Sequence, residues 1–218
     1  MNAIIDFRSV SVSADSKDIL SDITFSVPVG GKVALTGKSG AGKSSILHAL
    51  LGLLEPSSGE IFFDGTRVEP SSIDQVRSSV AYIGQEPVLG SASTVREALM
   101  LPFTFRANRD KRPDDPAVMR NLELLDLPGD ILDSDVDVIS GGEKQRIAIC
   151  RGLLQEKEIF LLDEVTSALD KESAEAVKTL LTRDRFTYLS VSHHDEWIEG
   201  CDTIIEMENG RITAYGNN

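Results

Sequence analysis

The sequence Gly-Lys-Ser-Gly-Ala-Gly-Lys-Ser at residues 37–44 has a composition and spacing that suit the binding of phosphate groups. A short apolar run at 32–36 precedes it, and a run at 45–54 with apolar residues at helical spacing follows it. A glycine-rich loop between a strand and a helix presents backbone N–H groups and the positive end of the helix dipole to an anion. We therefore expect a nucleotide to contact Gly37, Lys38, Ser39, Gly40, Ala41, Gly42, Lys43, Ser44 and Ser45.

Two side chains of this loop carry the expected chemistry. Lys43 should reach the β- and γ-phosphates, and the hydroxyl of Ser44 should hold Mg²⁺. A chance match to the motif would rarely have a strand-like run before it and a helix-like run after it. The pattern therefore predicts a site for a nucleoside triphosphate with Mg²⁺.

A second apolar run, at 159–162, ends in the carboxylates Asp163 and Glu164. In a parallel sheet, an aspartate at the carboxyl end of a buried strand lies beside the phosphate loop, so Asp163 is a candidate for the Mg²⁺ shell. Glu164 is placed to orient or deprotonate an attacking water. Alone, the pattern also fits an ordinary strand that is followed by an acidic turn. Together with the phosphate loop it predicts hydrolysis.

The distribution of apolar residues predicts the elements that position these groups. Alternating runs at 4–7, 10–12 and 23–27 predict antiparallel strands. Beyond them, strands are expected at 60–63, 80–83, 159–163 and 188–191, helices at 142–155 and 171–183, and a hairpin at 203–215 that turns at Asn209-Gly210. The alternation of strands and helices predicts an α/β fold with a mostly parallel sheet and an antiparallel N-terminal layer.

Residues 86–140 differ from the rest, because prolines divide them into short pieces. Helices are expected at 95–100 and 117–126, and the charged stretch 106–115 is expected to be a solvated loop. Leucines between 122 and 127 still need a core, so the segment is predicted to be a helical insertion. We expect one domain over residues 1–218, with a core of 1–85 and 141–218 and a helical subdomain at about 86–140.

Length and charge limit the class of protein. The chain has 218 residues, is 41% hydrophobic and carries a net charge of −13, which disfavours nucleic acid and anionic lipid as direct partners. No apolar stretch is long enough to cross a bilayer, and residues 1–6 lack the features of a secretory signal. We expect a cytosolic protein, without direct membrane insertion, in which Cys150 and Cys201 are free thiols.

A third motif, Ile-Ser-Gly-Gly-Glu at 139–143, precedes the 159–163 strand. It resembles the LSGGQ signature of the ABC-transporter ATPases. Gln85 then resembles the glutamine of the family's Q-loop, and Ser-Ala-Leu-Asp at 167–170 resembles its D-loop. His193 resembles the switch histidine, in preference to His194, whose position often holds aspartate in the family.

This resemblance implies an ATPase that works as a head-to-tail pair of copies around two ATP molecules. One copy would supply the catalytic residues Lys43, Gln85, Glu164 and His193, and the Mg²⁺ ligands Ser44, Gln85 and Asp163. The other copy would supply the signature residues Ser140, Gly141 and Gly142. ATP would join the copies, and hydrolysis would let them separate.

Two residues depart from the family pattern. Glu143 replaces the usual glutamine, and this change should keep the contacts of Ser140 and Gly142. Ala14 stands where the family usually has an aromatic residue that stacks on adenine. Loss of a stacked ring weakens base binding by about 1–3 kcal/mol, by analogy with nucleic-acid bases. We therefore expect GTP to compete better here than in a typical relative.

A single cassette of this length resembles the ATP-binding subunit of a multi-subunit transporter, held at the cytoplasmic face of the membrane by an integral-membrane permease. More narrowly, segments 101–103, 112–117, 127–132 and 164–170 resemble the ATPase of bacterial two-component iron exporters linked to oxidative-stress resistance. The alternatives are an ATPase for uptake or for lipid or peptide export, a soluble ABC ATPase acting on DNA or ribosomes, and a regulatory module without turnover. The acidic charge disfavours the DNA or ribosome alternative, and the complete set of catalytic residues disfavours the last.

Overall fold

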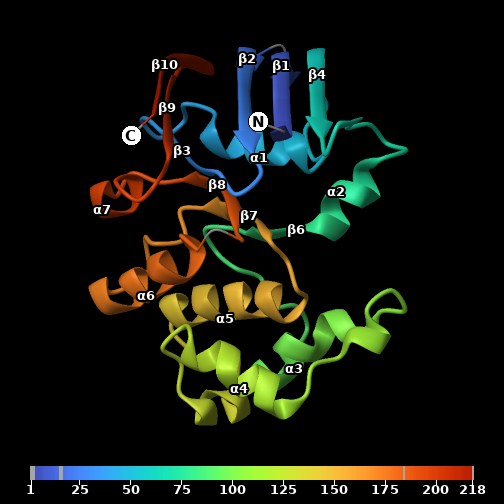
Figure 1. Cartoon of the computed structure of the whole chain (residues 1–218), viewed down its shortest axis with the longest axis vertical. Helices are drawn as coiled ribbons and strands as arrows, with labels where there is room; N and C mark the ends of the chain where they lie inside the picture. The colour runs from blue at the N-terminus through green and yellow to red at the C-terminus, as the bar shows by residue number, and fades with distance from the viewer. Residues whose placement is uncertain (1–2, 15–16, 184, 218) are drawn as a thin grey trace.

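The computed structural model describes residues 3–14, 17–183 and 185–217, so residues 1 and 2 of the N-terminal segment lie outside the described residues. Its strands form two sheets that share a core around helix α1 (Lys43–Leu50) (Figure 1). The smaller sheet is antiparallel and has the order β2 (Lys17–Pro28), β1 (Ala3–Ala14), β4 (Ser58–Phe63) and β5 (Thr66–Arg67). The predicted antiparallel N-terminal layer is confirmed.

A β-bulge joins two runs that the sequence pattern separates. In β1, Ile5 and Phe7 are buried on one side of the bulge, and Val10 and Val12 are buried on the other. The register against β2 shifts between Phe7 and Val10, where Ser9 takes a φ of 48°. Because the extra residue changes the phase of the alternation, both pairs face the same core. The two predicted strands are therefore one strand of 12 residues.

The larger sheet positions the two halves of the predicted phosphate site. Its order is β10 (Arg211–Asn217), β9 (Thr203–Glu208), β3 (Lys32–Thr36), β8 (Thr187–Val191), β7 (Ile159–Asp163) and β6 (Val80–Ile83), and only β10 pairs antiparallel. These strands and the 203–215 hairpin confirm the prediction. Since β3 and β7 are both neighbours of β8, the loops that follow them leave the same edge of the sheet one strand apart.

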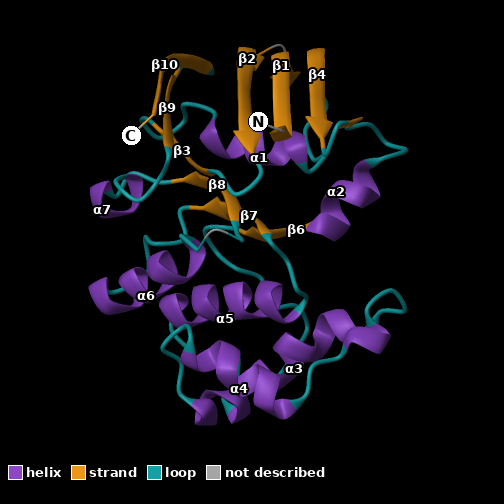
Figure 2. Cartoon of the chain, viewed as in Figure 1, coloured by secondary structure: helices purple, strands orange, loops and turns teal. Residues whose placement is uncertain are grey.

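Helices and short 3₁₀ turns cover the face of this larger sheet that lies away from α1, and they build a second core (Figure 2). Helix α5 (Gly141–Leu154) packs between strand β6 and the pair α3 (Val95–Met100) and α4 (Asp115–Glu123). Around them lie α6 (Lys171–Leu181), α7 (Asp195–Ile198) and the 3₁₀ helices η1 (Leu101–Thr104), η2 (Arg109–Lys111) and η3 (Gly129–Asp133). The predicted helical insertion is confirmed, while the division into core and helical subdomain stays a prediction.

Several element bounds differ from the predicted ones for local reasons. Helix α4 begins two residues early because the carboxylate of Asp114 caps it, accepting from the Ala117 amide at 2.8 Å. Helix α1 ends at Leu50 rather than at residue 54, and Gly52 follows with a φ of 64°. Strand β5 and helix α2 (Ile73–Ser79) were not predicted.

Both cysteines are free, as predicted, and both are buried. Burial raises the pKa of the Cys150 thiol to about 12 and also raises the pKa of Cys201. Because the thiolate is the reactive form, both side chains behave as packing residues.

Candidate functional site

The phosphate loop runs from the end of β3 to the start of α1, and two glycines shape it. Gly37 has a φ of 129°, and a Cβ there would lie 2.1 Å from the carbonyl oxygen of Met207. Gly42 has a φ of 96° and directly precedes the first helical residue, Lys43. Only glycine adopts these conformations without strain. The loop is thus held in a shape that presents the N-terminal amides of α1, which lack partners within the helix.

The ammonium group of Lys43 lies folded over this loop. Its Nζ donates to the carbonyl oxygens of Gly37 at 2.7 Å and Lys38 at 3.0 Å, and the residue is only 7% exposed. These two carbonyls hold the amine at the mouth of the loop. A phosphate oxygen could take the place of either one, because ammonium has three donors that rotate together.

Ser44 and Asp163 bring two oxygen ligands together. The Ser44 Oγ donates to Asp163 Oδ1 at 2.9 Å across the gap between α1 and β7. Burial raises the pKa of Asp163, although the hydrogen bond from Ser44 opposes this shift. Hydroxyl and carboxylate oxygens are ligands that Mg²⁺ prefers, so the donor set at this position fits that ion. The third predicted ligand, Gln85, lies on the loop after β6 and contacts Glu164.

Glu164 lies between two other predicted residues. Its Oε2 accepts from Gln85 Nε2 at 3.2 Å, and its Oε1 is 3.9 Å from His193 Nδ1. The Glu164 backbone has a φ of 52°, and its N–H donates to the Val191 carbonyl at 3.0 Å. A left-handed conformation is costly for a residue other than glycine, and it aims the carboxylate away from the strand direction. His194, by contrast, stands at the N-cap of α7.

A cavity of about 770 Å³ joins these groups to Ala14, which the sequence had indicated, and to residues that it had not. Its walls include Lys43, Ser44, Gln85 and Glu164, and also Ala14, Lys17, Asp18 and Ile19 of β1 and β2 and the turn Asn209-Gly210. The turn braces the phosphate loop, since the Gly210 N–H donates to the Ala41 carbonyl at 3.0 Å. The Asn-Gly pair predicted a hairpin turn, but nothing in its spacing pointed to the site.

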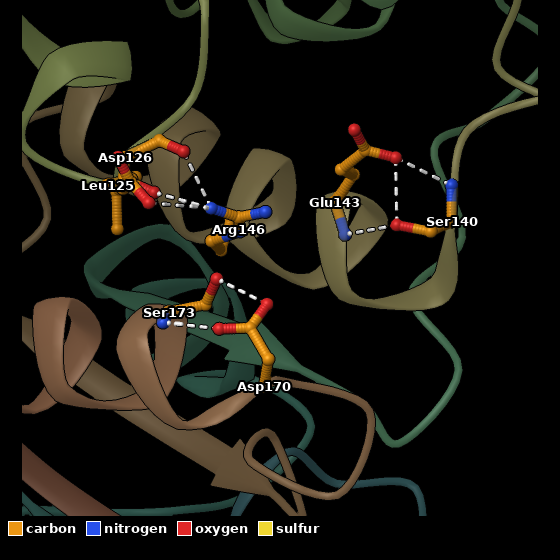
Figure 3. Close-up of polar contacts among 7 residues, drawn as sticks. All are labelled: Leu125, Asp126, Ser140, Glu143, Arg146, Asp170 and Ser173. Atoms are coloured by element: carbon orange, nitrogen blue, oxygen red, sulfur yellow. Dashed lines mark hydrogen bonds and ion pairs between the residues drawn. The ribbon is translucent and has the colours of Figure 1, made fainter.

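The signature residues do not line this cavity. Ser140 caps α5 and forms a capping box, in which its Oγ accepts from the Glu143 N–H at 3.2 Å and its own N–H donates to Glu143 Oε2 at 2.8 Å (Figure 3). The Ser140 Oγ also donates to Glu143 Oε2 at 2.7 Å. Gly142 lies against the 167–170 segment, since a Cβ there would be 2.7 Å from the Ala168 carbonyl oxygen. The hydrogen bonds from Ser140 lower the pKa of Glu143. Within one chain the signature is thus separate from the phosphate loop.

Arg146 and Asp170 fix the surroundings of the signature (Figure 3). The Arg146 guanidinium is largely buried and donates to the carbonyls of Leu125 at 3.2 Å and Asp126 at 2.6 Å. Asp170 caps α6 by accepting from the Ser173 amide at 2.8 Å and its hydroxyl at 3.0 Å. These contacts join the start of α5 to the end of α4 and set the end of the 167–170 segment.

Comparison with known proteins gives consistent matches. The family described as ABC transporter matches residues 20–167. The probable iron export ATP-binding protein FetA of Escherichia coli K12 is 33% identical over 94% of this chain and 91% of its own length. The ATP-dependent lipid A-core flippase of Methylococcus capsulatus is 34% identical over 97% of this chain and 36% of its own length.

Among solved structures, a bacterial Atm1-family ABC exporter with ATP bound has a TM-score of 0.86 and 28% identity, over 98% of this chain and 38% of that chain. The chain thus spans about a third of the length of the flippase and of this exporter, and nearly all of the iron-export protein. In the part of the chain that the structure describes, no helix has the length and apolar character needed to span a membrane.

Proposed function

This chain is an ATPase cassette that belongs to the ABC transporter family, and on that basis we propose that it drives a separate membrane permease as the ATP-hydrolysing subunit of an exporter. The observation that carries the proposal is that Lys43, Ser44 and Glu164 line one cavity, with Asp163 hydrogen-bonded to Ser44, while Ser140 lies elsewhere in the same chain. Such a chain holds one part of a triphosphate site and lacks the rest. A second copy supplies the missing part.

Each residue has a chemical task in this proposal. Lys43 exchanges its two carbonyl partners for β- and γ-phosphate oxygens. Ser44, Asp163 and Gln85 hold Mg²⁺, which when bound neutralises charge on the phosphates. Glu164 accepts a proton from the attacking water, and Gln85 and His193 flank its carboxylate.

The second copy would place Ser140, Gly141 and Gly142 over the γ-phosphate. The N-terminal amides of α5 and the hydroxyl of Ser140 are donors of the kind that bind phosphate. A head-to-tail pair would contain two such sites, because each copy has one phosphate loop and one signature. ATP then favours the closed pair through contacts that ADP lacks, and hydrolysis opens it.

We propose iron as the cargo because the match with FetA covers nearly all of both chains. FetA, a probable iron export ATP-binding protein, matches this chain over nearly its whole length, whereas the flippase carries the cassette within a longer chain. The proposed partner is a separate permease, and the cassette would lie at the cytoplasmic face of the membrane. A lipid or drug exporter is the second candidate, since the flippase is as similar in sequence.

The test is affinity purification of the tagged chain from detergent-solubilised membranes, followed by mass spectrometry. The expected result is one multi-span permease in stoichiometric amount. A V88D variant should lose it, because Val88 is a 79% exposed apolar residue on the loop after Gln85. The matched control is V29D, which changes a 65% exposed valine beyond β2. Recovery of soluble partners alone would contradict the transporter proposal.

Cargo is tested by reconstituting the recovered complex in proteoliposomes. ATP-dependent movement of Fe²⁺ that is lost in E164Q would support the iron proposal. ATP-dependent movement of a labelled lipid, with no movement of Fe²⁺, would favour the second candidate.

A further inference from the structure

We infer that Gln145, on helix α5, is a positioning residue that holds Gln85 against Glu164. The inference rests on the proposed function, in which Gln85 and Glu164 act on ATP. Two consecutive hydrogen bonds, from Gln145 to Gln85 and from Gln85 to Glu164, support the inference. Gln145 Nε2 donates to the backbone carbonyl of Gln85 at 3.2 Å, and Gln85 Nε2 donates to Glu164 Oε2 at 3.2 Å. Helix α5 is thereby linked to the carboxylate through the Gln85 residue.

The need for such a link follows from where Gln85 lies. Residues 84–93 connect β6 to α3 without helix or strand, and Gln85 itself is exposed. A loop of this kind does not fix a side chain as well as a helix or strand does. Gln145, in contrast, is 0% exposed on a helix of 14 residues that packs into the core. Helix α5 therefore sets the position of Gln85 on the 84–93 loop.

A second contact shows how the loop runs along the helix. The Arg151 Nη2 donates to the carbonyl of Val88 at 3.2 Å. Arg151 is six residues after Gln145, which is about 9 Å along a helix axis. The 85–88 segment is therefore tied to α5 at both of its ends, through Gln145 and Arg151.

The amide oxygen of Gln145 indicates that this residue is present for function rather than for folding. Among the described residues, its Oε1 is a buried oxygen without a hydrogen-bond partner. A buried polar atom of this kind costs folding free energy, which an apolar side chain of the same shape would avoid. The donor side of the amide, aimed at Gln85, is the feature that an apolar side chain could not replace.

The link also joins two places that serve different ATP molecules in the proposed pair. Helix α5 begins at the signature, where Ser140 would contact the ATP held by the other copy. Gln85 would serve the ATP held by its own copy. A shift of α5 when the pair closes would therefore move Gln85 through Gln145. Binding of ATP at the signature of one copy would in this way affect the ATP held by the phosphate loop of the same copy.

The experiment measures steady-state ATP hydrolysis by the purified full chain. Q145M keeps the shape of the side chain and removes the donor, and kcat should fall about tenfold with KM for ATP unchanged, because a small displacement of a catalytic group impairs turnover more than binding. The matched control is Q155M at the C-cap of the same helix, where Gln155 Nε2 donates to the Arg151 carbonyl. Its kcat should stay within twofold of wild type.

Combination with Q85A separates positioning from a general structural effect. If Gln145 acts through the Gln85 side chain, Q145M should cause no further loss of kcat in the Q85A background. A full further tenfold loss, or an unchanged kcat in Q145M alone, would overturn the inference. Should Q145M not fold, Q145L, which also lacks the donor and carries no charge, takes its place in the same comparison. If Q85A and E164Q themselves leave kcat unchanged, the proposed function fails rather than the role of Gln145.

Discussion

The Ser44 hydroxyl and the Asp163 carboxylate lie 2.9 Å apart, although 119 residues separate them in sequence. The contact joins the first turn of α1 to the end of β7, so a helix and the larger sheet both contribute to the site. Asp163 is only 7% exposed, and burial raises its pKa. A buried carboxylate is costly for folding and well suited to a cation, so the Ser44–Asp163 pair is a place where function is favoured over stability.

Replacement of Lys43 should weaken nucleotide binding rather than folding. K43M removes the charge-assisted contact to phosphate, and the affinity for ATP should fall by about 10- to 100-fold. Isothermal titration calorimetry with ATP measures this directly. The control is K171M, because Lys171 is 83% exposed and pairs only with the exposed Glu196. Equal affinity in K43M and wild type would remove Lys43 from the site.

Gly37 should tolerate no side chain. In G37A the new Cβ would meet the Met207 carbonyl at 2.1 Å in a left-handed conformation, and the free energy of unfolding should fall by about 2–4 kcal/mol. The comparison is G65A, where φ is 72° and nothing lies within 4 Å, so about 1–2 kcal/mol of backbone strain is expected. Urea unfolding of both variants checks the difference. A loss in G37A no greater than that in G65A would contradict the close approach.

The sequence predicted the chemistry of the site better than its walls. Lys43, Ser44, Asp163 and Glu164 stand in motifs whose local spacing already specifies a loop, a helix start or a strand end. Lys17 and Asn209 reach the same cavity from segments far away in sequence, and their place depends on how the sheets pack. No local pattern records such packing.

The features of the fold that the sequence did not predict also lack a recognisable local pattern. The β1 bulge at Ser9 interrupts the alternation that identifies a strand, so one strand looked like two. Helix α2 is short and mostly exposed, with Val76 as its buried residue, and it lacks a periodic apolar face. The left-handed backbone of Glu164 was also not predictable, since the residue type gives no sign of it.

Acid should weaken the cap of helix α5. Hydrogen bonds from Ser140 lower the pKa of Glu143, so the stability contributed by its ionised form is complete above the ordinary glutamate pKa and is lost as the pH falls through the lowered value. E143Q should therefore be less stable than wild type by about 0.5–1 kcal/mol at pH 7. This difference should begin to fall near the ordinary glutamate pKa of about 4.3 and vanish only below the lowered value.

Urea unfolding at several pH values measures this difference. E208Q, which alters an exposed glutamate at the end of β9, is the control and should show no such dependence. A difference for E143Q that does not shrink at pH values below the ordinary glutamate pKa of about 4.3 would exclude the ionised cap.

The base of the nucleotide should be weakly selected. Ala14 lines the cavity beside Lys17 and offers no ring for stacking. GTP should therefore compete with ATP within about tenfold, and A14Y should favour whichever base stacks on the new ring, with a gain of about 1–3 kcal/mol. Competition of ATP and GTP for a fluorescent nucleotide checks both statements. A strong ATP preference in the wild-type chain would contradict the first.

The central claim is that one ATP site is built from two copies, and the molar mass of E164Q tests it most directly. Loss of the general base should lower kcat by about 10²- to 10⁴-fold while ATP still binds. Light scattering should then give 23.7 kDa without nucleotide and twice that mass with ATP. Adding S140R, which blocks the signature, should return the ATP-bound chain to 23.7 kDa. An E164Q chain that binds ATP and remains at 23.7 kDa would contradict the account.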